Sequence, residues 1–462
     1  MTKTDNKNKS KFRKPSKKIL ILAIVCTFYL VLALMYSLWT PAWEANDEAD
    51  HTIYAERIVA YHHIPHISLA NGHESHQPPL YYIALAGWQK ILSIPVFEPD
   101  PIPVAGGEAL GPSTQPKLGL SHNYNSRLKQ EAVWVHELRV LSILFGLGTV
   151  IFTFLVANAL TKKINFSVAA TLFVVLLPKQ LVINSVVTND SLVVMLCSLL
   201  LYLAVKCCTA EDKRLRLYSF LMGATAGAAT LTKLNSLPLS ILFFAILACF
   251  LYKKEKHFLS GTALYAGGFM LLCAWWLLYN WKMYGDPIAQ AASNNYLEAA
   301  IPGLIKPVSW FNTQRFIHFL PSELHSTAWY DGGWNQLILP GWVNTSLWAL
   351  AFISFVGVGV YMRKYVRHWY SGEWWRALFL VTAVATGLLT TYIIARTTVQ
   401  AEGRVAYIGL SAFAIFCTVG LATVLARVSI HLNNAGLFLW PAILALVNVY
   451  VLLHILIPLH AL

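Results

Sequence analysis

The residues best suited to chemistry form an acidic cluster directly after a long apolar segment. Residues 19–39 are apolar over a length that crosses a membrane, and the acids follow at once. The cluster comprises Glu44, Asp47, Glu48 and Asp50, with His51 beside them. Charge at a membrane edge is costly to desolvate, so acids there are candidates for a functional site, and a carboxylate is a suitable general base. The alternative is a solvated loop in which Asp47 caps the following helix.

A second group of candidates lies further along the first polar region. His76, Tyr81 and Tyr82 belong to the passage HQPPLYY, in which two prolines set the direction of a helix start. Arg139 stands at the mouth of the next apolar segment, where its guanidinium could bind a phosphate through two N–H groups. The alternative is that Arg139 is an interfacial residue that extends from the membrane into water.

The remaining candidates lie at the ends of later apolar segments. Asn189 and Asp190 open one of them, where a helix cap is the alternative. Lys233 separates two short segments, and Arg404 follows Glu402-Gly403 at the start of another. The passage YGDP at 284–287 is a turn by composition.

Composition identifies the kind of protein that must position these residues. The 462 residues are 56% hydrophobic and only 12% charged, about half the charged fraction of a soluble protein. We therefore expect an all-α polytopic membrane protein with about eleven transmembrane helices. The expected spans are 19–39, 138–160, 164–183, 190–206, 217–233, 237–252, 258–279, 342–361, 377–395, 405–427 and 436–456.

The charge distribution orients these spans and argues against a nucleic-acid partner. The net charge is +13, but this topology puts most of the 35 bases and few of the 22 acids on the inside. Residues 1–18 are then a disordered basic cytoplasmic tail, and 19–462 form one transmembrane domain. The first outer loop, 40–137, is expected to carry interfacial helices at 50–62 and 80–92 and a lid at 93–120. A second outer loop covers 280–341.

Histidines are concentrated in the first outer loop, which raises the question of a metal. Six of them lie within residues 51–76: His51, His62, His63, His66, His73 and His76. With the nearby acids they could hold a divalent metal, but their spacing fits no ligand motif. We therefore predict no metal and no cofactor.

The order of the motifs resembles the C-type (GT-C) integral-membrane glycosyltransferases. The resemblance is to those similar to protein O-mannosyltransferases and to the aminoarabinose transferase that modifies lipid A. It rests on DExxHxxYAE from Asp47, HQPPLYY from His76, RVLS from Arg139, NDS from Asn189 and LTKL around Lys233. Two positions depart from the pattern, since Gln77 stands where proline is common and Glu402 precedes Gly-Arg where glutamine is usual.

The resemblance implies a polyprenyl-phosphate sugar donor and inverting transfer to an acceptor hydroxyl at the extracytoplasmic face. It gives Asp47 the role of base, with Glu48 as its catalytic neighbour. Arg139 is the first candidate for binding the donor phosphate, with Lys233 and Arg404 behind it. The expected substrate-binding residues are His51, His76, Tyr81, Tyr82, Asn189 and Asp190. The acceptor could be a glycan, a lipid or a protein.

Two other classes of protein share parts of this pattern. A transporter or flippase of a lipid-linked or small polar solute would also have many spans, but transporters tend to carry ionisable residues within spans and internal repeats. Here the acids crowd one outer surface and no repeat is visible. A scaffold would need neither a pair of acids nor a phosphate-directed arginine.

Overall fold

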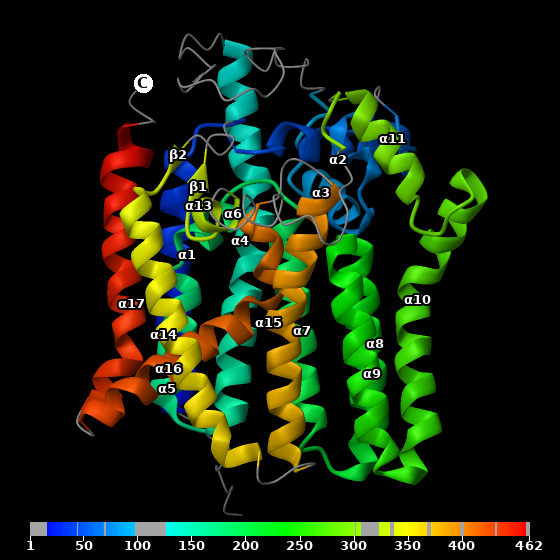
Figure 1. Ribbon diagram of the computed structural model, residues 1–462. Helices are drawn as coiled ribbons and strands as arrows, with labels where there is room; N and C mark the ends of the chain where they lie inside the picture. Colours follow the sequence, from blue (N-terminus) through cyan, green and yellow to red (C-terminus); the bar gives the residue numbers. More distant parts are fainter. Residues whose placement is uncertain are drawn as a thin grey trace, which may run out of the picture.

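The computed structural model describes residues 16–43, 45–68, 71–97, 126–300, 302–305, 323–332, 337–366, 371–397, 402–429 and 432–458. These residues are almost entirely helical, which confirms the expected all-α membrane fold (Figure 1). The described β-structure is one antiparallel pair, β1 (Asp331–Gly332) and β2 (Leu337–Ile338). Glu44 and most of the expected lid lie outside the described residues.

Nine described helical segments are long and apolar enough to cross a membrane. They contain the helices α1 (Lys17–Trp39), α4 (Ser126–Thr161), α7 (Asp190–Cys207), α9 (Leu237–Tyr252), α10 (Phe258–Tyr284), α14 (Gly341–Val366), α15 (Gly372–Thr397), α16 (Leu410–Val428) and α17 (Leu432–Val451). Each coincides with one of the eleven expected spans.

The other two expected spans are helical but not simple crossings. Segment 164–183 is α5 (Ile164–Val175) and α6 (Pro178–Asn184), which meet at 66°. Pro178 explains the break, because it lacks an N–H and disfavours the helical conformation of the residue before it. Segment 217–233 falls in α8 (Asp212–Thr232), a helix of 21 residues that is not among the nine apolar segments.

Small residues explain how α8 and α10 pack together. A Cβ atom on Gly223 of α8 would collide with the carbonyl oxygen of Tyr265, and one on Gly268 of α10 would collide with that of Phe220. Glycine at both positions therefore lets the two backbones approach closely, as is common between helices in membranes.

The polar elements gather at one end of the helix bundle (Figure 1). They are α2 (Glu48–Tyr61), η2 (His73–His76), α3 (Leu80–Ile91), α11 (Gln290–Ala300), α13 (His325–Thr327) and the β1–β2 pair. α2 and α3 confirm the two helices expected in the first outer loop, while the α9–α10 and α14–α15 connections lie at the opposite end. The side of the membrane on which each end lies stays a prediction.

Side-chain contacts fix the first outer loop on the bundle. Tyr54 of α2 stacks on Tyr82 of α3 with ring centroids 3.9 Å apart. Trp88 of α3 donates to the carbonyl of Glu137 in α4, and Tyr284 of α10 accepts from the backbone N–H of Ile67. The loop is thus held by α4 on one side and by α10 on the other.

Candidate active site

Glu48 and Arg139 form a buried ion pair beneath the first outer loop. Arg139 donates from Nε to Glu48 Oε1 and from Nη2 to Glu48 Oε2, both at 2.7 Å, in a two-pronged geometry. Its remaining N–H groups bind the carbonyls of Ser37, Thr40 and Pro41 at 2.7–2.9 Å. Arg139 is 0% exposed, so it has no N–H left for a phosphate. These contacts give Arg139 a structural role, and its binding of a donor phosphate stays a prediction.

Glu48 connects the same pair to two further backbone segments. Its carboxylate accepts from the N–H of Trp43 at 3.1 Å and from that of Val187 at 2.9 Å. The ion pair therefore joins the end of α1, the start of α2, the turn before α7 and α4 at one buried point. A buried charge pair is tolerated when its remaining hydrogen-bonding groups are satisfied in this way. Glu48 thus holds together the backbone segments on which the site is built.

Asp47, the residue before, occupies a different environment. Its backbone is left-handed, with φ 61°, and its side chain makes no capping bond to α2. It accepts instead from Arg404 Nη2 at 3.0 Å, so Arg404, and not Arg139, is the guanidinium beside this carboxylate. A left-handed residue other than glycine costs about 1 kcal/mol. The turn directs Asp47 away from the Glu48 pocket, and its side chain is 22% exposed.

Arg404 is the centre of a charged network that unites four parts of the chain. It lies in the short helix η6 (Gly403–Gly409) and also contacts Glu402 at 2.7 Å and Asp190 at 3.5 Å. Lys233, where α8 ends, binds the other oxygen of Asp190 at 2.6 Å. The sequence therefore predicted Asp47, Asp190, Lys233 and Arg404 as site residues, and the structure brings them together.

The network extends to two residues that the sequence reasoning did not select. Lys179 of α6 forms a salt bridge with Asp331 of β1, and its Nζ lies 3.7 Å from Glu402 Oε2. Both residues are buried. A lone lysine within a predicted span was the available signal, because ionisable residues in spans are rare and usually functional. Asp331 carried no comparable signal.

Only part of this network is open to solvent. The side chains of Lys233 and Arg404 are 16% and 14% exposed, whereas that of Asp190 is 2% exposed. The accessible groups are therefore two cations and the carboxylates of Asp47 and Glu402, with Asp190 buried between the cations. Such an arrangement can bind an anion beside a proton acceptor.

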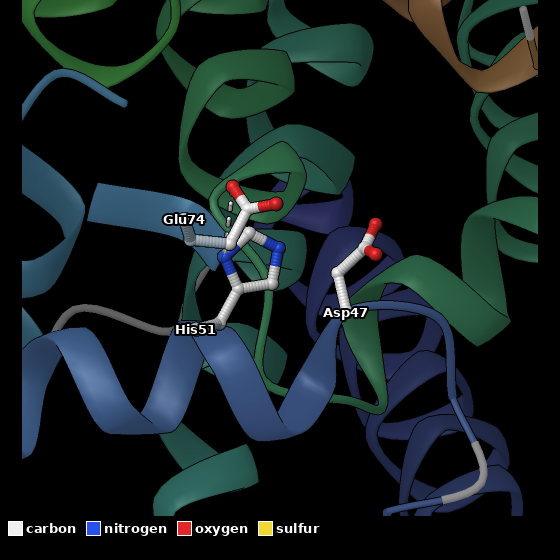
Figure 2. A group of neighbouring side chains, drawn as sticks. All are labelled: Asp47, His51 and Glu74. Carbon is white, nitrogen blue, oxygen red and sulfur yellow. Dashed lines mark ion pairs between the residues drawn. The ribbon is translucent and has the colours of Figure 1, made fainter. Parts of the chain in front are cut away.

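His51 and Glu74 lie beside Asp47 (Figure 2), and Tyr82 contacts both of them. His51 Nδ1 is 2.9 Å from the Tyr82 hydroxyl and 3.7 Å from Glu74 Oε2. His51 Nε2 is 3.4 Å from the Thr188 hydroxyl, and Asn189 donates to Tyr82 at 3.3 Å. Glu74 was not selected from the sequence, although it lies within the HESHQPPLYY passage.

Two of the expected substrate-binding residues lie further back. Tyr81 is fully buried, and its hydroxyl is 3.0 Å from that of Ser142 in α4. His76 Nδ1 is 2.9 Å from the carbonyl of His73 in the same turn, and its ring lies 6.2 Å from that of Tyr296. Both residues contribute to the packing of the first outer loop, and their contact with a substrate stays a prediction.

Burial and neighbouring charges set the protonation of the outer-loop groups. Burial opposes ionisation of Asp47, but the positive charge of Arg404 outweighs it and lowers the pKa of Asp47. Burial raises the pKa of Glu74, which His51 offsets in part. Burial also lowers the pKa of His51, and it lowers the pKa of His76 to about 4. The imidazoles are thus neutral at physiological pH, and Asp47 is ionised.

An apolar cavity adjoins the charged network. It is lined by Gly403, Ala406 and Tyr407 of η6, together with Leu177, Trp329 and residues of α15 and α16. Gly403 precedes Arg404 in the chain, so the cavity lies against the short helix that carries this guanidinium. A molecule with a charged head and a hydrocarbon tail matches this combination.

Comparisons with known proteins find a match among solved structures only. No family model and no curated protein matches the chain. The oligosaccharyltransferase of Archaeoglobus fulgidus is 13% identical with a TM-score of 0.45, covering 97% of this chain and 55% of its own. ArnT from Cupriavidus metallidurans in the apo state is 13% identical with a TM-score of 0.47, covering 96% of this chain and 73% of its own. The structure of ArnT bound to undecaprenyl phosphate gives 15% identity and a TM-score of 0.45.

The chain thus spans about half the length of the archaeal enzyme that it matches.

Proposed function

We propose that the protein is a membrane glycosyltransferase that moves a sugar from a polyprenyl phosphate to an acceptor hydroxyl at the extracytoplasmic face. The observation that carries this proposal is the accessible carboxylate of Asp47, held 3.0 Å from Arg404, which shares Asp190 with Lys233 at one end of the bundle. The order of the sequence motifs supports the same class of enzyme. The sugar and the acceptor are left open.

Arg404 and Lys233 are the proposed ligands of the donor phosphate. Both are partly exposed, and Asp190 holds them on either side of its carboxylate. A phosphate leaving group needs positive charge fixed close to it, and charge-assisted hydrogen bonds from Arg and Lys supply it. The hydrocarbon chain of the donor would then run from the phosphate into the adjoining apolar cavity or the bilayer.

Asp47 is the proposed base. Its carboxylate takes the proton of the acceptor hydroxyl while the acceptor oxygen bonds to the anomeric carbon, and the bond from that carbon to the phosphate oxygen breaks. The electron pair stays on the phosphate, and the anomeric centre inverts. A positioned general base contributes about 10² to 10⁴ in rate.

Binding of the donor would also activate this base. Without a donor, Arg404 lowers the pKa of Asp47 and makes it a weak proton acceptor. A phosphate that draws Arg404 into its own hydrogen bonds weakens this effect and adds negative charge near Asp47. Both changes raise the pKa of Asp47, so proton abstraction is coupled to the presence of the donor.

Donor binding tests this assignment. We expect Arg404→Gln and Lys233→Gln to weaken binding of undecaprenyl phosphate to the purified protein at least tenfold. Glu373→Gln, at the opposite end of the bundle, serves as the control. Unchanged affinity in both cation variants would refute the proposed phosphate site.

A transporter or flippase of a lipid-linked or polar solute is the second candidate. The bent pair α5 and α6 carries the buried Lys179, and broken helices with buried charge occur at transporter sites. Uptake of a labelled solute into liposomes, without glycosyl transfer from any polyprenyl-phosphate sugar in a panel, would favour it.

A further inference from the structure

We propose that a pocket at the end of the bundle opposite the candidate active site binds an anionic phospholipid, with Arg376 of α15 holding its phosphate. The pocket lies between α4, α5, α14, α15 and α16. α14 ends and α15 begins at this end of the bundle, which the charge distribution predicts to be the cytoplasmic one (Figure 1). The proposal does not depend on glycosyl transfer.

Arg376 has only long hydrogen bonds within the protein. Its Nη1 donates to the carbonyl of Ala159 in the last turn of α4 at 3.4 Å, and its Nε donates to the carbonyl of Gly372 at 3.3 Å. Arg139, by contrast, binds Glu48 and three carbonyls at 2.7–2.9 Å. Among the described residues, the nearest acceptor of Arg376 is thus 3.3 Å away, and N–H groups remain for an anion.

The charge of Arg376 is also largely removed from water. Its side chain is 14% exposed, and its acidic neighbour Glu373 lies 3.9 Å from Nη2 with a side chain that is 58% exposed. A cation that is mostly buried without a close anion is costly, and a bound phosphate would remove that cost. The alternative is that Arg376 only caps the end of α4. The bond to Ala159 accounts for Nη1 in that way, but it leaves Nη2 with the distant Glu373 alone.

The position of Arg376 along the bundle suits a lipid phosphate. The residue lies one turn into α15, and its acceptor Ala159 lies close to the end of α4, so the guanidinium is level with the ends of the helices. Phospholipid phosphates lie at this level, just outside the hydrocarbon core. An arginine there can bind two oxygens of one phosphate through parallel N–H groups.

The rest of the pocket suits an acyl chain. Each of the five helices contributes an apolar side chain to its lining, among them Leu160, Phe166, Val358, Leu380 and Phe416. Apolar side chains below a single guanidinium match a molecule with a charged head and a hydrocarbon tail. The acyl chain would pack along these side chains while the phosphate stays at Arg376.

The surrounding charge favours an anionic lipid over a zwitterionic one. Lys162 and Lys163 directly follow the end of α4, Arg363 lies near the end of α14, and all three are exposed. Glu373 is the only acid among the residues that line the pocket, and its exposed carboxylate can turn into water. Basic pockets between helices at the cytoplasmic surface are suited to anionic lipid head groups.

A phospholipid is a better match than the proposed polyprenyl-phosphate donor. The cations assigned to the donor, Arg404 and Lys233, lie at the other end of the bundle, so a donor bound there could not reach this pocket. Anionic phospholipids, in contrast, surround this end of the bundle whenever the protein is in a membrane.

The test is native mass spectrometry of the delipidated, full-length protein titrated with phosphatidylglycerol or phosphatidylcholine. We expect one phosphatidylglycerol to bind at least tenfold more tightly than phosphatidylcholine. Arg376→Gln should lose this preference, whereas Arg376→Lys, which keeps the charge but not the planar fork, should retain part of it. Lys213→Gln is the control, because it removes an equal charge from a side chain that is 76% exposed where α8 begins, at the same end of the bundle. It should bind both lipids as the wild type does.

A second readout guards against variants that fold poorly. Phosphatidylglycerol should raise the melting temperature of the wild type and of Lys213→Gln more than phosphatidylcholine does, but not that of Arg376→Gln. Equal affinity of the wild type for the two lipids, or an unchanged preference in Arg376→Gln, overturns the site. Undecaprenyl phosphate is the competitor. If it displaced phosphatidylglycerol at lower concentration, and did so in Arg404→Gln but not in Arg376→Gln, the pocket would belong to the donor lipid and the proposal would be overturned as well.

Discussion

The buried pair of Glu48 and Arg139 allows a structural role to be separated from a role in donor binding. Arg139→Met removes the guanidinium and leaves Glu48 buried without its ionic partner. Breaking a buried pair in this way costs about 3–5 kcal/mol. It also frees the carbonyls of Ser37, Thr40 and Pro41, each of which loses a donor. We therefore expect a loss of stability at the upper end of that range, measured by chemical unfolding in detergent.

Two further variants make this expectation specific. The double variant Glu48→Gln with Arg139→Met leaves no isolated charge, so it should be less destabilised than Arg139→Met alone. Lys213→Met, which breaks the exposed pair with Glu211, should change stability by less than about 1 kcal/mol. If Arg139→Met kept wild-type stability but weakened binding of undecaprenyl phosphate, Arg139 would be a donor ligand and the reasoning would be refuted.

Three other variants test the neighbouring features. Glu74→Gln should stabilise the protein near neutral pH and give a smaller gain at acid pH, because burial raises the pKa of Glu74 and its ionised form destabilises the fold. A gain that stays the same across a pH series of melting curves would contradict this. Lys179→Met should lower the free energy of unfolding by about 3 kcal/mol, because it leaves Asp331 buried and unpaired. Wild-type stability of this variant would mean that the ion pair contributes nothing. Gly223→Ala should lower the free energy of unfolding by about 1–3 kcal/mol, because the added methyl group pushes α8 away from α10. Gly267→Ala, whose new methyl group would meet open space, should leave stability unchanged. Equal effects of the two substitutions would contradict the close approach of the helices as the cause.

The sequence predicted which helices and residues belong to the site better than it predicted which side chains pair with each other. Apolar segments, the spacing of residues 50–62 and the HQPPLYY passage were enough to predict the spans, α2 and α3, because each depends on local periodicity or on proline. Asp47, Asp190, Lys233 and Arg404 were also recognisable, since charge at the end of an apolar segment is conspicuous.

The choice of partner could not be read from the sequence. Arg139 and Arg404 both stand at the ends of spans, and only the packed structure shows that the first is enclosed by Glu48 and the second reaches Asp47. Asp47 and Glu48 are adjacent, but the left-handed backbone at Asp47 directs their side chains to different arginines. The bend after α5 was foreseeable from Pro178, whereas the salt bridge of Lys179 with Asp331 depends on contacts between distant segments.

Single-turnover transfer by Asp47→Asn, with donor affinity measured on the same sample, tests the central claim most directly. The amide cannot accept the proton, and it releases Arg404 for the phosphate. We expect at least a 100-fold slower transfer step, because a general base is lost, with donor affinity equal to or tighter than that of the wild type. Transfer at the wild-type rate would contradict it.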